Sequence, residues 1–278
     1  MVTVPPLRAP LFVPADRPER FAKAAASGAC SVILDLEDAV APSAKIAARA
    51  ALTCDFTDLP VVVRINPAGT PWHEADVQAA AALPFAAIML PKAEDPDAIA
   101  QIARRTGRPI LALIESARGL AAARHIAAVP NVTQLVFGSI DFCADLGCAH
   151  LRETLRPVRL ELVLASRLAG LAAPVDGVTV DLSNLTLTED DSVHARSLGM
   201  RGKLCIHPKQ VAAVRKGFAP TQADCDWAKR VLASGEGAVS VDGAMVDEPV
   251  RIRARAILAD ADAINPVVSV APAPYGAG

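Results

Sequence analysis

Eight short apolar runs alternate with helical patterns over the first 218 residues, and this alternation limits the possible folds more than any other feature. The apolar runs, which read as strands, are 11–14, 31–38, 61–66, 86–94, 109–116, 132–142, 176–184 and 202–208. The helical patterns are 18–27, 43–51, 73–82, 97–105, 119–128, 151–169, 191–198 and 208–218. Eight successive strand–helix units predict an α/β protein with a (β/α)8 TIM barrel.

An open, doubly wound parallel sheet is the alternative fold for such an alternation. That fold would place a Gly-rich G-x-G-x-x-G turn after an early strand, where a helix begins. The sequence contains no such turn. We therefore expect the closed barrel rather than the open sheet.

The pattern changes beyond Phe218. Residues 221–234 read as a helix with Thr221 as its N-cap, residues 238–247 as two short strands around a turn at Asp242-Gly243, and residues 249–260 as a last helix. A barrel does not need these elements to close. We expect a catalytic TIM-barrel domain at 8–218, a helix–hairpin–helix extension that serves as a lid or subunit contact at 219–262, and a disordered tail at 263–278.

The composition excludes several classes of protein. With 28 basic and 30 acidic residues, a net charge of −2 and no basic stripe, the chain is not expected to bind nucleic acid. The longest apolar run, 79–91, is too short to span a membrane, and the N-terminus lacks the plan of a signal peptide. The six cysteines form no C-x-x-C motif, which favours reduced thiols in a cytoplasmic protein.

Ionisable side chains stand at the carboxyl ends of the predicted strands, where TIM barrels carry their active sites. In chain order they are Asp35, Glu37, Asp38, Arg64, Lys92, Glu94, Glu115, Asp141, Asp181 and His207. Because the strand ends of a barrel meet at one mouth, we expect these groups to form a site rather than a solvated rim. His207 is the weakest candidate, since a single histidine at a strand end is more often a packed structural group.

Glu115 and Asp141 are the preferred metal ligands of this set, because each ends an apolar run. Two carboxylates with room for water suit octahedral Mg²⁺, whereas no His/Cys cluster suggests Zn²⁺. The alternative is that one of them pairs with Arg64. Arg64 itself suits a substrate carboxylate or an enolate oxygen, and a salt bridge to Glu37 or Asp38 would be compatible with that role.

Eight longer motifs follow one another along the chain. They are L-F-V-P-A-D-R-P-E-R-F-A-K-A, V-I-L-D-L-E-D-A-V-A-P, V-V-V-R-I-N-P, M-L-P-K-A-E, A-L-I-E-S-A-R-G-L, F-G-S-I-D-F-C-A-D-L-G, G-K-L-C-I-H-P-K-Q-V and D-G-A-M-V-D-E-P-V. Together they resemble the citrate lyase β-subunit-like (CitE-like) proteins of the HpcH/HpaI aldolase superfamily, near malyl-CoA and citramalyl-CoA lyases. The resemblance runs from about residue 8 to residue 260.

The resemblance implies a Mg²⁺-dependent carbon–carbon lyase that is usually a homotrimer. Such enzymes cleave a 3-hydroxyacyl thioester into a 2-oxo acid and acetyl-CoA, or acetyl on a carrier protein, or run the reverse condensation. The family's metal ligands fall on Glu115 and Asp141, and its substrate-binding arginine falls on Arg64. Its acid/base residue falls on Asp247, which would reach the active site of a neighbouring subunit.

Further roles follow for residues around this centre. The resemblance assigns Glu37 and Asp38 to metal-bound waters, and it gives Glu115 contact with the substrate as well as the metal. Asp35, earlier in its strand, is expected to be a buried acid paired with a lysine or arginine. The phosphates of coenzyme A are expected to contact basic residues near the first strand–helix turn, namely Arg17, Arg20 and Lys23.

The chain departs from the family pattern in two places. Where the family often has G-A-E-D, residues 138–141 read G-S-I-D, so Ile140 replaces an acid beside the ligand. Where the family's seventh strand often reads Y-T-D-I-R-D, this chain has V-T-V-D-L-S-N, which keeps Asp181 but not the Arg–Asp pair. These departures leave the substrate open among malyl-, citramalyl- and citryl-CoA, and the direction of the reaction is open too.

Two other functions stay open. One is the lyase subunit of a citrate lyase complex, which would dock a carrier protein. The other is a class II aldolase acting on a free 2-oxo acid, without coenzyme A. The complete set of Arg64, Glu115, Asp141 and Asp247 favours a stand-alone acyl-CoA lyase over both.

Overall fold

A computed structural model of the protein describes residues 7–264. The chain divides after Phe218 into two compact units, and each unit has its own hydrophobic core. Within residues 7–264, no helix combines the length and the apolar character that a membrane span requires.

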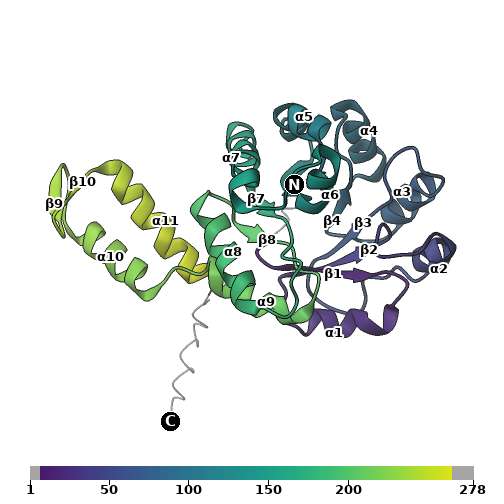
Figure 1. Ribbon diagram of the computed structural model, residues 1–278, viewed down its shortest axis with the longest axis horizontal. Coiled ribbons are helices and arrows are strands. Elements are labelled where there is room, and N and C mark those ends of the chain that lie inside the picture. The colour runs from purple at the N-terminus through teal and green to yellow at the C-terminus, as the bar shows by residue number, and fades with distance from the viewer. Residues whose placement is uncertain (1–6, 265–278) are drawn as a thin grey trace, which may run out of the picture. The chain divides into compact units, whose positions relative to one another are not determined.

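Eight parallel strands follow one another in sequence order around the first unit (Figure 1). They are β1 (Pro10–Pro14), β2 (Ser31–Asp35), β3 (Val61–Arg64), β4 (Ala87–Leu90), β5 (Ile110–Ile114), β6 (Val132–Phe137), β7 (Ala172–Asp176) and β8 (Gly202–Lys203). The chain after β8 returns to β1, where Leu11 forms a parallel bridge with Cys205 and the Phe12 N–H donates to the Cys205 carbonyl at 2.9 Å. The prediction of a (β/α)8 TIM barrel is confirmed.

Side chains along each strand alternate between the barrel interior and the layer under the helices. Ile33, Val62 and Met89 belong to a cluster inside the barrel, whereas their neighbours Leu34 and Val63 belong to the larger cluster shared with the helices. Both faces of the sheet are therefore apolar, which is why the strands read as continuous apolar runs in the sequence.

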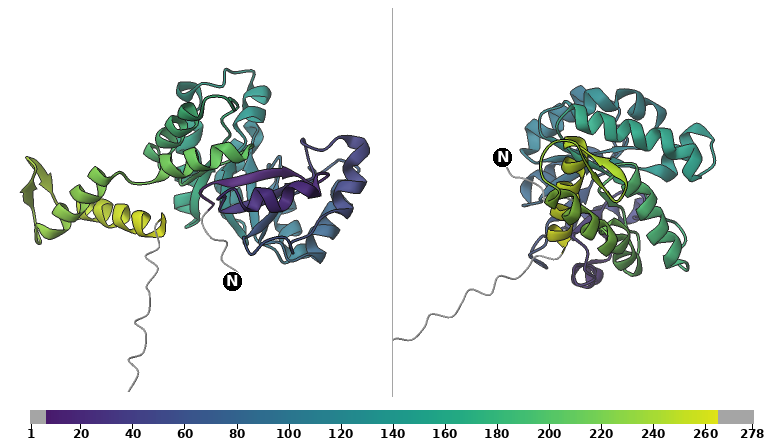
Figure 2. Two further views of the ribbon diagram at one scale, coloured as in Figure 1. Left: turned by 90° about the horizontal axis from the view of Figure 1, so that it is seen from below. Right: turned by 90° about the vertical axis from the view of Figure 1, so that its left-hand side faces the viewer.

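Helices surround the strands of this unit (Figure 1, Figure 2). They are α1 (Phe21–Ala25), α2 (Lys45–Ala50), α3 (His73–Ala82), α4 (Pro96–Thr106), α5 (Ala117–Ala127), α6 (Ser139–Leu146), α7 (Arg152–Leu168), α8 (Leu185–Ser197) and α9 (Pro208–Phe218), with 3-10 turns at Pro18–Arg20 and Pro42–Ala44. The helices predicted over 73–82 and 208–218 are confirmed with those bounds.

Several of the predicted strands are too long, as at 202–208, where β8 ends at Lys203, and two of them conceal other elements. The strand predicted over 132–142 ends at Phe137, because Gly138 breaks it and Ser139 begins α6, a helix that was not predicted. The strand predicted over 176–184 is displaced, since β7 is Ala172–Asp176 and the following residues form a loop. β7 contains Pro174, which is unusual in a central strand and hides it from a pattern search.

The second unit is a helical hairpin that carries a small β-hairpin. Its elements are α10 (Gln222–Ala233), β9 (Val239–Val241), β10 (Ala244–Val246) and α11 (Glu248–Ile264), with α10 and α11 side by side (Figure 2). Thr221 caps α10 as predicted, since its hydroxyl accepts from the Asp224 N–H at 3.0 Å. The predicted turn at Asp242 and Gly243 is present, with positive φ at both residues.

The disordered tail predicted at 263–278 is wrong at its first two residues. Residues 263 and 264 continue α11, which carries the helix four residues past the predicted end at 260. The rest of that prediction, 265–278, lies outside the described residues.

Candidate active site

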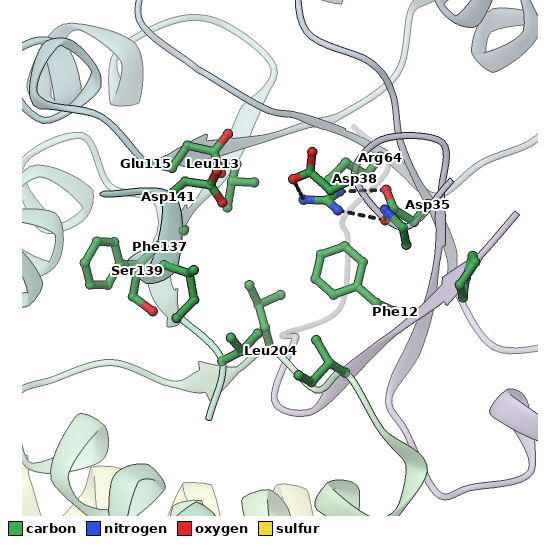
Figure 3. A pocket seen from close by; sticks show the side chains of 16 residues that line it. Phe12, Asp35, Asp38, Arg64, Leu113, Glu115, Phe137, Ser139, Asp141 and Leu204 are labelled. Carbon is green, nitrogen blue, oxygen red and sulfur yellow. Dashed lines mark hydrogen bonds and ion pairs between the residues drawn. The ribbon is translucent and has the colours of Figure 1, made fainter. Parts of the chain in front are cut away.

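A cavity of about 380 Å³ lies at the carboxyl ends of the barrel strands (Figure 3). Its charged lining consists of Asp35, Asp38, Arg64, Glu115 and Asp141. The charged groups lie along one side of the cavity, and apolar side chains that include Phe12 and Leu204 lie along the other (Figure 3). Polar groups from several strand ends therefore meet in one place, with an apolar surface opposite them.

Arg64 is held in a fixed orientation at the cavity wall. Its Nε and Nη2 each donate to one oxygen of Asp35 at 2.7 Å, and its Nη1 lies 2.9 Å from Oε2 of Glu37. The Phe12 ring lies 4.7 Å from the guanidinium carbon. The β2–β3 register places Asp35 opposite Arg64, so Asp35 is a buried acid whose basic partner is Arg64. Because a guanidinium carries five N–H groups, Arg64 keeps donors for a ligand.

Glu37 is buried beside Arg64 without a complete set of partners. Its Oε2 forms no hydrogen bond within the described residues, although it lies 2.9 Å from Nη1 of Arg64 as an ion pair. Burial raises the pKa of Glu37 to about 8, although the charge of Arg64 acts in the opposite direction. Asp38 is exposed and lies 4.0 Å from Arg64. The charge of Arg64 therefore offsets the burial of Glu37 only in part.

Glu115 and Asp141 lie next to each other in the cavity (Figure 3), and a lysine ammonium compensates both. Nζ of Lys92 lies 3.2 Å from Oδ1 of Asp141 and 3.6 Å from Oε1 of Glu115. Burial raises the pKa of Glu115 to about 7, while Lys92 lowers it. In the described part of the chain, the ion pairs of these two acids are with Lys92 and not with Arg64. Sequence reasoning did not foresee that pairing.

Gly138 and the first turn of α6 bring the two acids together. A Cβ atom at position 138 would lie 2.5 Å from Oε2 of Glu115, so only glycine leaves that carboxylate its place. Asp141 then stands in the first turn of α6, not at the end of a strand as predicted. The glycine inside V-F-G-S-I-D was the available signal, because glycine in a strand pattern marks a break or a close approach.

The charges around the cavity suit a bound divalent cation. The acids are Asp35, Glu37, Asp38, Glu115 and Asp141, and the bases paired with them are Arg64 and Lys92. Within residues 7–264, no group of three or more His, Cys, Asp or Glu side chains is placed to hold a metal. Glu115 and Asp141 could supply two oxygen ligands and leave the other positions to water, an arrangement typical of Mg²⁺.

A second cavity, of about 410 Å³, adjoins the first. It shares Phe12, Pro14 and Ile206 with the first cavity, and its basic lining is Arg20, Lys23 and His207. Arg17, the third basic residue of the prediction, is not part of this lining and pairs with Glu19 at 3.0 Å on the surface.

Asp181, which was singled out in the sequence, does not line the cavity that contains Glu115 and Asp141 (the carboxylate cavity). Asp181 belongs to the loop after β7 and accepts hydrogen bonds from Ser183, while the residue that ends β7 is Asp176. Asp176 is fully buried and pairs with Arg159 at 2.7 Å and with Lys203 at 3.1 Å. Burial alone would raise the pKa of Asp176, but these two cations lower it.

Asp247 lies in the second unit, between β10 and α11. Its Oδ1 accepts from the Val250 N–H at 3.4 Å, and its carbonyl accepts from the Arg251 N–H at 3.1 Å, as at the start of a helix. Its predicted action in a neighbouring subunit remains a prediction.

Comparisons with known proteins agree on one family. Residues 8–208 match the family described as HpcH/HpaI aldolase/citrate lyase. A citrate lyase subunit beta-like protein of Mycobacterium tuberculosis is 40% identical over 263 residues, which are 89% of this chain and 93% of the relative. A (3S)-malyl-CoA thioesterase of Cereibacter sphaeroides is 34% identical over 93% of this chain and 96% of its own length.

A solved structure is similar over almost the whole chain. It is the CitE protein of M. tuberculosis in complex with magnesium, acetoacetate and coenzyme A, with a TM-score of 0.84 and 38% identity. The similarity covers 94% of this chain and 99% of that one.

Proposed function

The chain belongs to the HpcH/HpaI aldolase/citrate lyase family, and we propose that it is a Mg²⁺-dependent carbon–carbon lyase acting on a 3-hydroxyacyl-CoA thioester. Cleavage would release acetyl-CoA and a 2-oxo acid, and condensation would be the reverse. Malyl-, citramalyl- and citryl-CoA are thioesters of this class. The M. tuberculosis CitE complex with magnesium and coenzyme A supports this choice of cofactor and substrate.

One observation carries the proposal: two adjacent carboxylates, Glu115 and Asp141, line a cavity that also contains a fixed guanidinium, Arg64. The carboxylates suit the cation, and the guanidinium suits an oxygen that gains negative charge. The ammonium of Lys92 between the two carboxylates marks the position that a cation would compete for.

The reaction breaks the bond between C2 and C3 of the thioester. The C3 hydroxyl loses its proton and becomes the carbonyl of the 2-oxo acid, while the electron pair of the broken bond passes to the acetyl-CoA enolate, which is then protonated on carbon. Bound Mg²⁺ supplies Lewis acidity towards the hydroxyl and the neighbouring carboxylate. Glu115 and Asp141 hold that ion, and Arg64 donates to the enolate oxygen or the carbonyl.

The remaining acids have supporting roles in this proposal. Glu37 and Asp38 hold metal-bound waters, and Glu37 also orients Arg64 through their 2.9 Å contact. Asp247 of a neighbouring copy in a homotrimer protonates the enolate carbon, or removes a proton from acetyl-CoA in the condensing direction. Within residues 7–264 its side chain accepts only the 3.4 Å hydrogen bond from Val250, which leaves it available for this role.

The second cavity is the proposed place for coenzyme A. Arg20 and Lys23 provide positive charge for its phosphates. The wall shared with the first cavity, at Phe12, Pro14 and Ile206, would let the thioester reach the carboxylates while the phosphates stay with these bases. Arg17 would have to leave Glu19 to take part.

Thioester hydrolysis is a second candidate activity, because a relative is named a (3S)-malyl-CoA thioesterase. Hydrolysis would release free coenzyme A and the intact hydroxy acid, so the products separate the two activities. A citrate lyase subunit would co-purify with a carrier protein, and a free 2-oxo-acid aldolase would need neither the basic cavity nor the Asp247 hairpin.

Product analysis tests the proposal. The purified chain would be incubated with malyl-, citramalyl- and citryl-CoA, with Mg²⁺ or with EDTA, and the products separated by liquid chromatography and mass spectrometry. We expect acetyl-CoA and the matching 2-oxo acid only with Mg²⁺. Glu115→Gln should abolish this activity, whereas Asp181→Asn, outside the cavity, should retain it. Free coenzyme A without acetyl-CoA would replace the lyase proposal with hydrolysis.

A further inference from the structure

We propose that the acyl group recognised by this chain carries an aliphatic substituent at C3 and one free carboxylate, so that the oxo acid released or consumed is an aliphatic 2-oxo acid such as pyruvate or 2-oxobutyrate. A dicarboxylic oxo acid, such as oxaloacetate, fits poorly. The inference rests on the proposed lyase function and specifies the substrate of the same cavity.

Three aliphatic side chains from separate parts of the chain line the carboxylate cavity, and we call them the aliphatic wall. Ile140 comes from the first turn of α6, Val178 from the loop after β7 and Ile206 from the loop after β8. Ile140 is 40% exposed and Ile206 is 41% exposed. Leu113 and Leu204 also line the cavity and are buried, with Leu113 beside Glu115 and Leu204 on the opposite side (Figure 3). Exposed aliphatic groups gathered at a cavity are typical of a surface that a ligand covers.

Ile140 directly precedes Asp141, one of the two proposed metal ligands. A hydroxy acid bound by the metal ion places its C3 close to Asp141. The substituent on C3 is then within reach of Ile140. The residue next to the ligand offers this substituent only methyl and methylene groups. An aliphatic substituent can bury its surface there, whereas a charged one loses its hydration.

Among the described residues that line the cavity, no cation remains available for a second carboxylate of the substrate. Arg64 is the one cation among these described residues, and the proposed reaction uses its remaining donors at the enolate oxygen or the carbonyl. Lys92 does not line the cavity; in this structure its ammonium lies 3.2 Å from Asp141 and 3.6 Å from Glu115. The surrounding acids would moreover repel another negative charge. A substrate with a single free carboxylate, held by the metal, meets neither difficulty.

The experiment measures condensation of acetyl-CoA with glyoxylate, pyruvate, 2-oxobutyrate and oxaloacetate by the full chain in the presence of Mg²⁺. We expect kcat/KM to rise about fourfold for each methyl or methylene group that the wall buries, and oxaloacetate to be the poorest substrate. A preference for oxaloacetate or glyoxylate would overturn this inference and leave the lyase proposal standing. Condensation with none of the acids would overturn both.

Two variants place a cation at the aliphatic wall, namely Ile206→Lys and Val178→Lys. Each should shift the ratio of kcat/KM for oxaloacetate over pyruvate upward by about tenfold or more, because a nearby ammonium stabilises the second carboxylate. Two positions in different loops guard against one variant that fails to fold. The matched control is Ile46→Lys on α2, a site 74% exposed and outside the cavity, which should leave the ratio unchanged.

These variants also separate acyl recognition from contact with the pantetheine arm of coenzyme A. If the wall contacts the arm, Ile206→Lys would change the KM for acetyl-CoA equally with every oxo acid and leave the ratio as it is. That result would overturn the inference. A changed ratio with an unchanged KM for acetyl-CoA would support it.

Discussion

Replacing Asp35 with asparagine should destabilise the barrel and misplace Arg64 at the same time. Asparagine has the same shape, so its oxygen can still accept the backbone N–H of Glu37, which donates to Oδ1 of Asp35 at 2.9 Å. The substitution removes the negative charge and turns an amide NH₂ towards one of the two Arg64 nitrogens that donate at 2.7 Å. The same NH₂ also replaces the oxygen that accepts the Ala39 N–H at 3.3 Å, so the substitution removes this weaker bond together with the ion pair.

The size of the effect follows from burial. The Asp35 side chain is 1% exposed and that of Arg64 is 11% exposed, so water compensates little of the loss. Removing one partner of a buried ion pair costs about 3–5 kcal/mol in free energy of unfolding. We expect the lower end, about 3 kcal/mol, because Glu37 stays 2.9 Å from the guanidinium. For a chain of this size that corresponds to about 6 °C or more in Tm.

Urea unfolding, monitored by circular dichroism, measures the loss in free energy of unfolding. The kcat/KM of the same samples reports whether Arg64 keeps its position. Asp181→Asn is the matched control, since that acid lies in a loop outside the cavity, and it should change neither quantity. Asp35→Asn combined with Arg64→Gln should lose less than the sum of the single changes. A loss below about 1 kcal/mol, or strict additivity, would refute the claim that this pair organises the site.

Three further predictions concern charge. Asp247→Ala should abolish turnover while Mg²⁺ binding, measured by calorimetry, stays intact, and substantial residual activity would contradict its assignment as the acid. Lys92→Met should tighten Mg²⁺ binding in the same assay, because the ammonium no longer competes for Glu115 and Asp141, and weaker binding would argue against competition. Since burial raises the pKa of Glu37 to about 8, its contribution to stability is complete below about pH 4.5 and is lost as the pH rises through 8. The urea concentration at the unfolding midpoint of the metal-free chain should therefore decrease as the pH is raised from 6 to 8.5. Glu37→Gln should make this decrease smaller.

The barrel could be predicted because its strands are buried on both faces and separated by helices with clear signals. Pro208, for example, stands at the first position of α9, where its fixed φ favours a helix start. β7 could not be found in this way, because its buried part is short and includes Pro174. α6 was missed because Ile140 and Phe142 extend the apolar run of β6 and conceal the break at Gly138.

The site could be predicted as a set of residues but not as a set of contacts. Three acids stand at the end of β2 or just after it, and only the β2–β3 register decides that Asp35 is the one opposite Arg64. The pairing of Lys92 with Glu115 depends on a left-handed backbone at Lys92, where φ is 47°, and on a turn of the chain that no pattern reveals. Contacts of this kind come from three-dimensional register, which spacing along the chain does not encode.

The most direct test of the central claim is the rate of acetyl-CoA formation from citramalyl-CoA as Mg²⁺ is titrated into metal-free protein. The proposed ligation by Glu115 and Asp141 predicts a rate that rises from zero to saturation with Mg²⁺ and that Glu115→Gln abolishes across the titration. Acetyl-CoA formed at the same rate in EDTA, or by the Glu115→Gln variant, would contradict it.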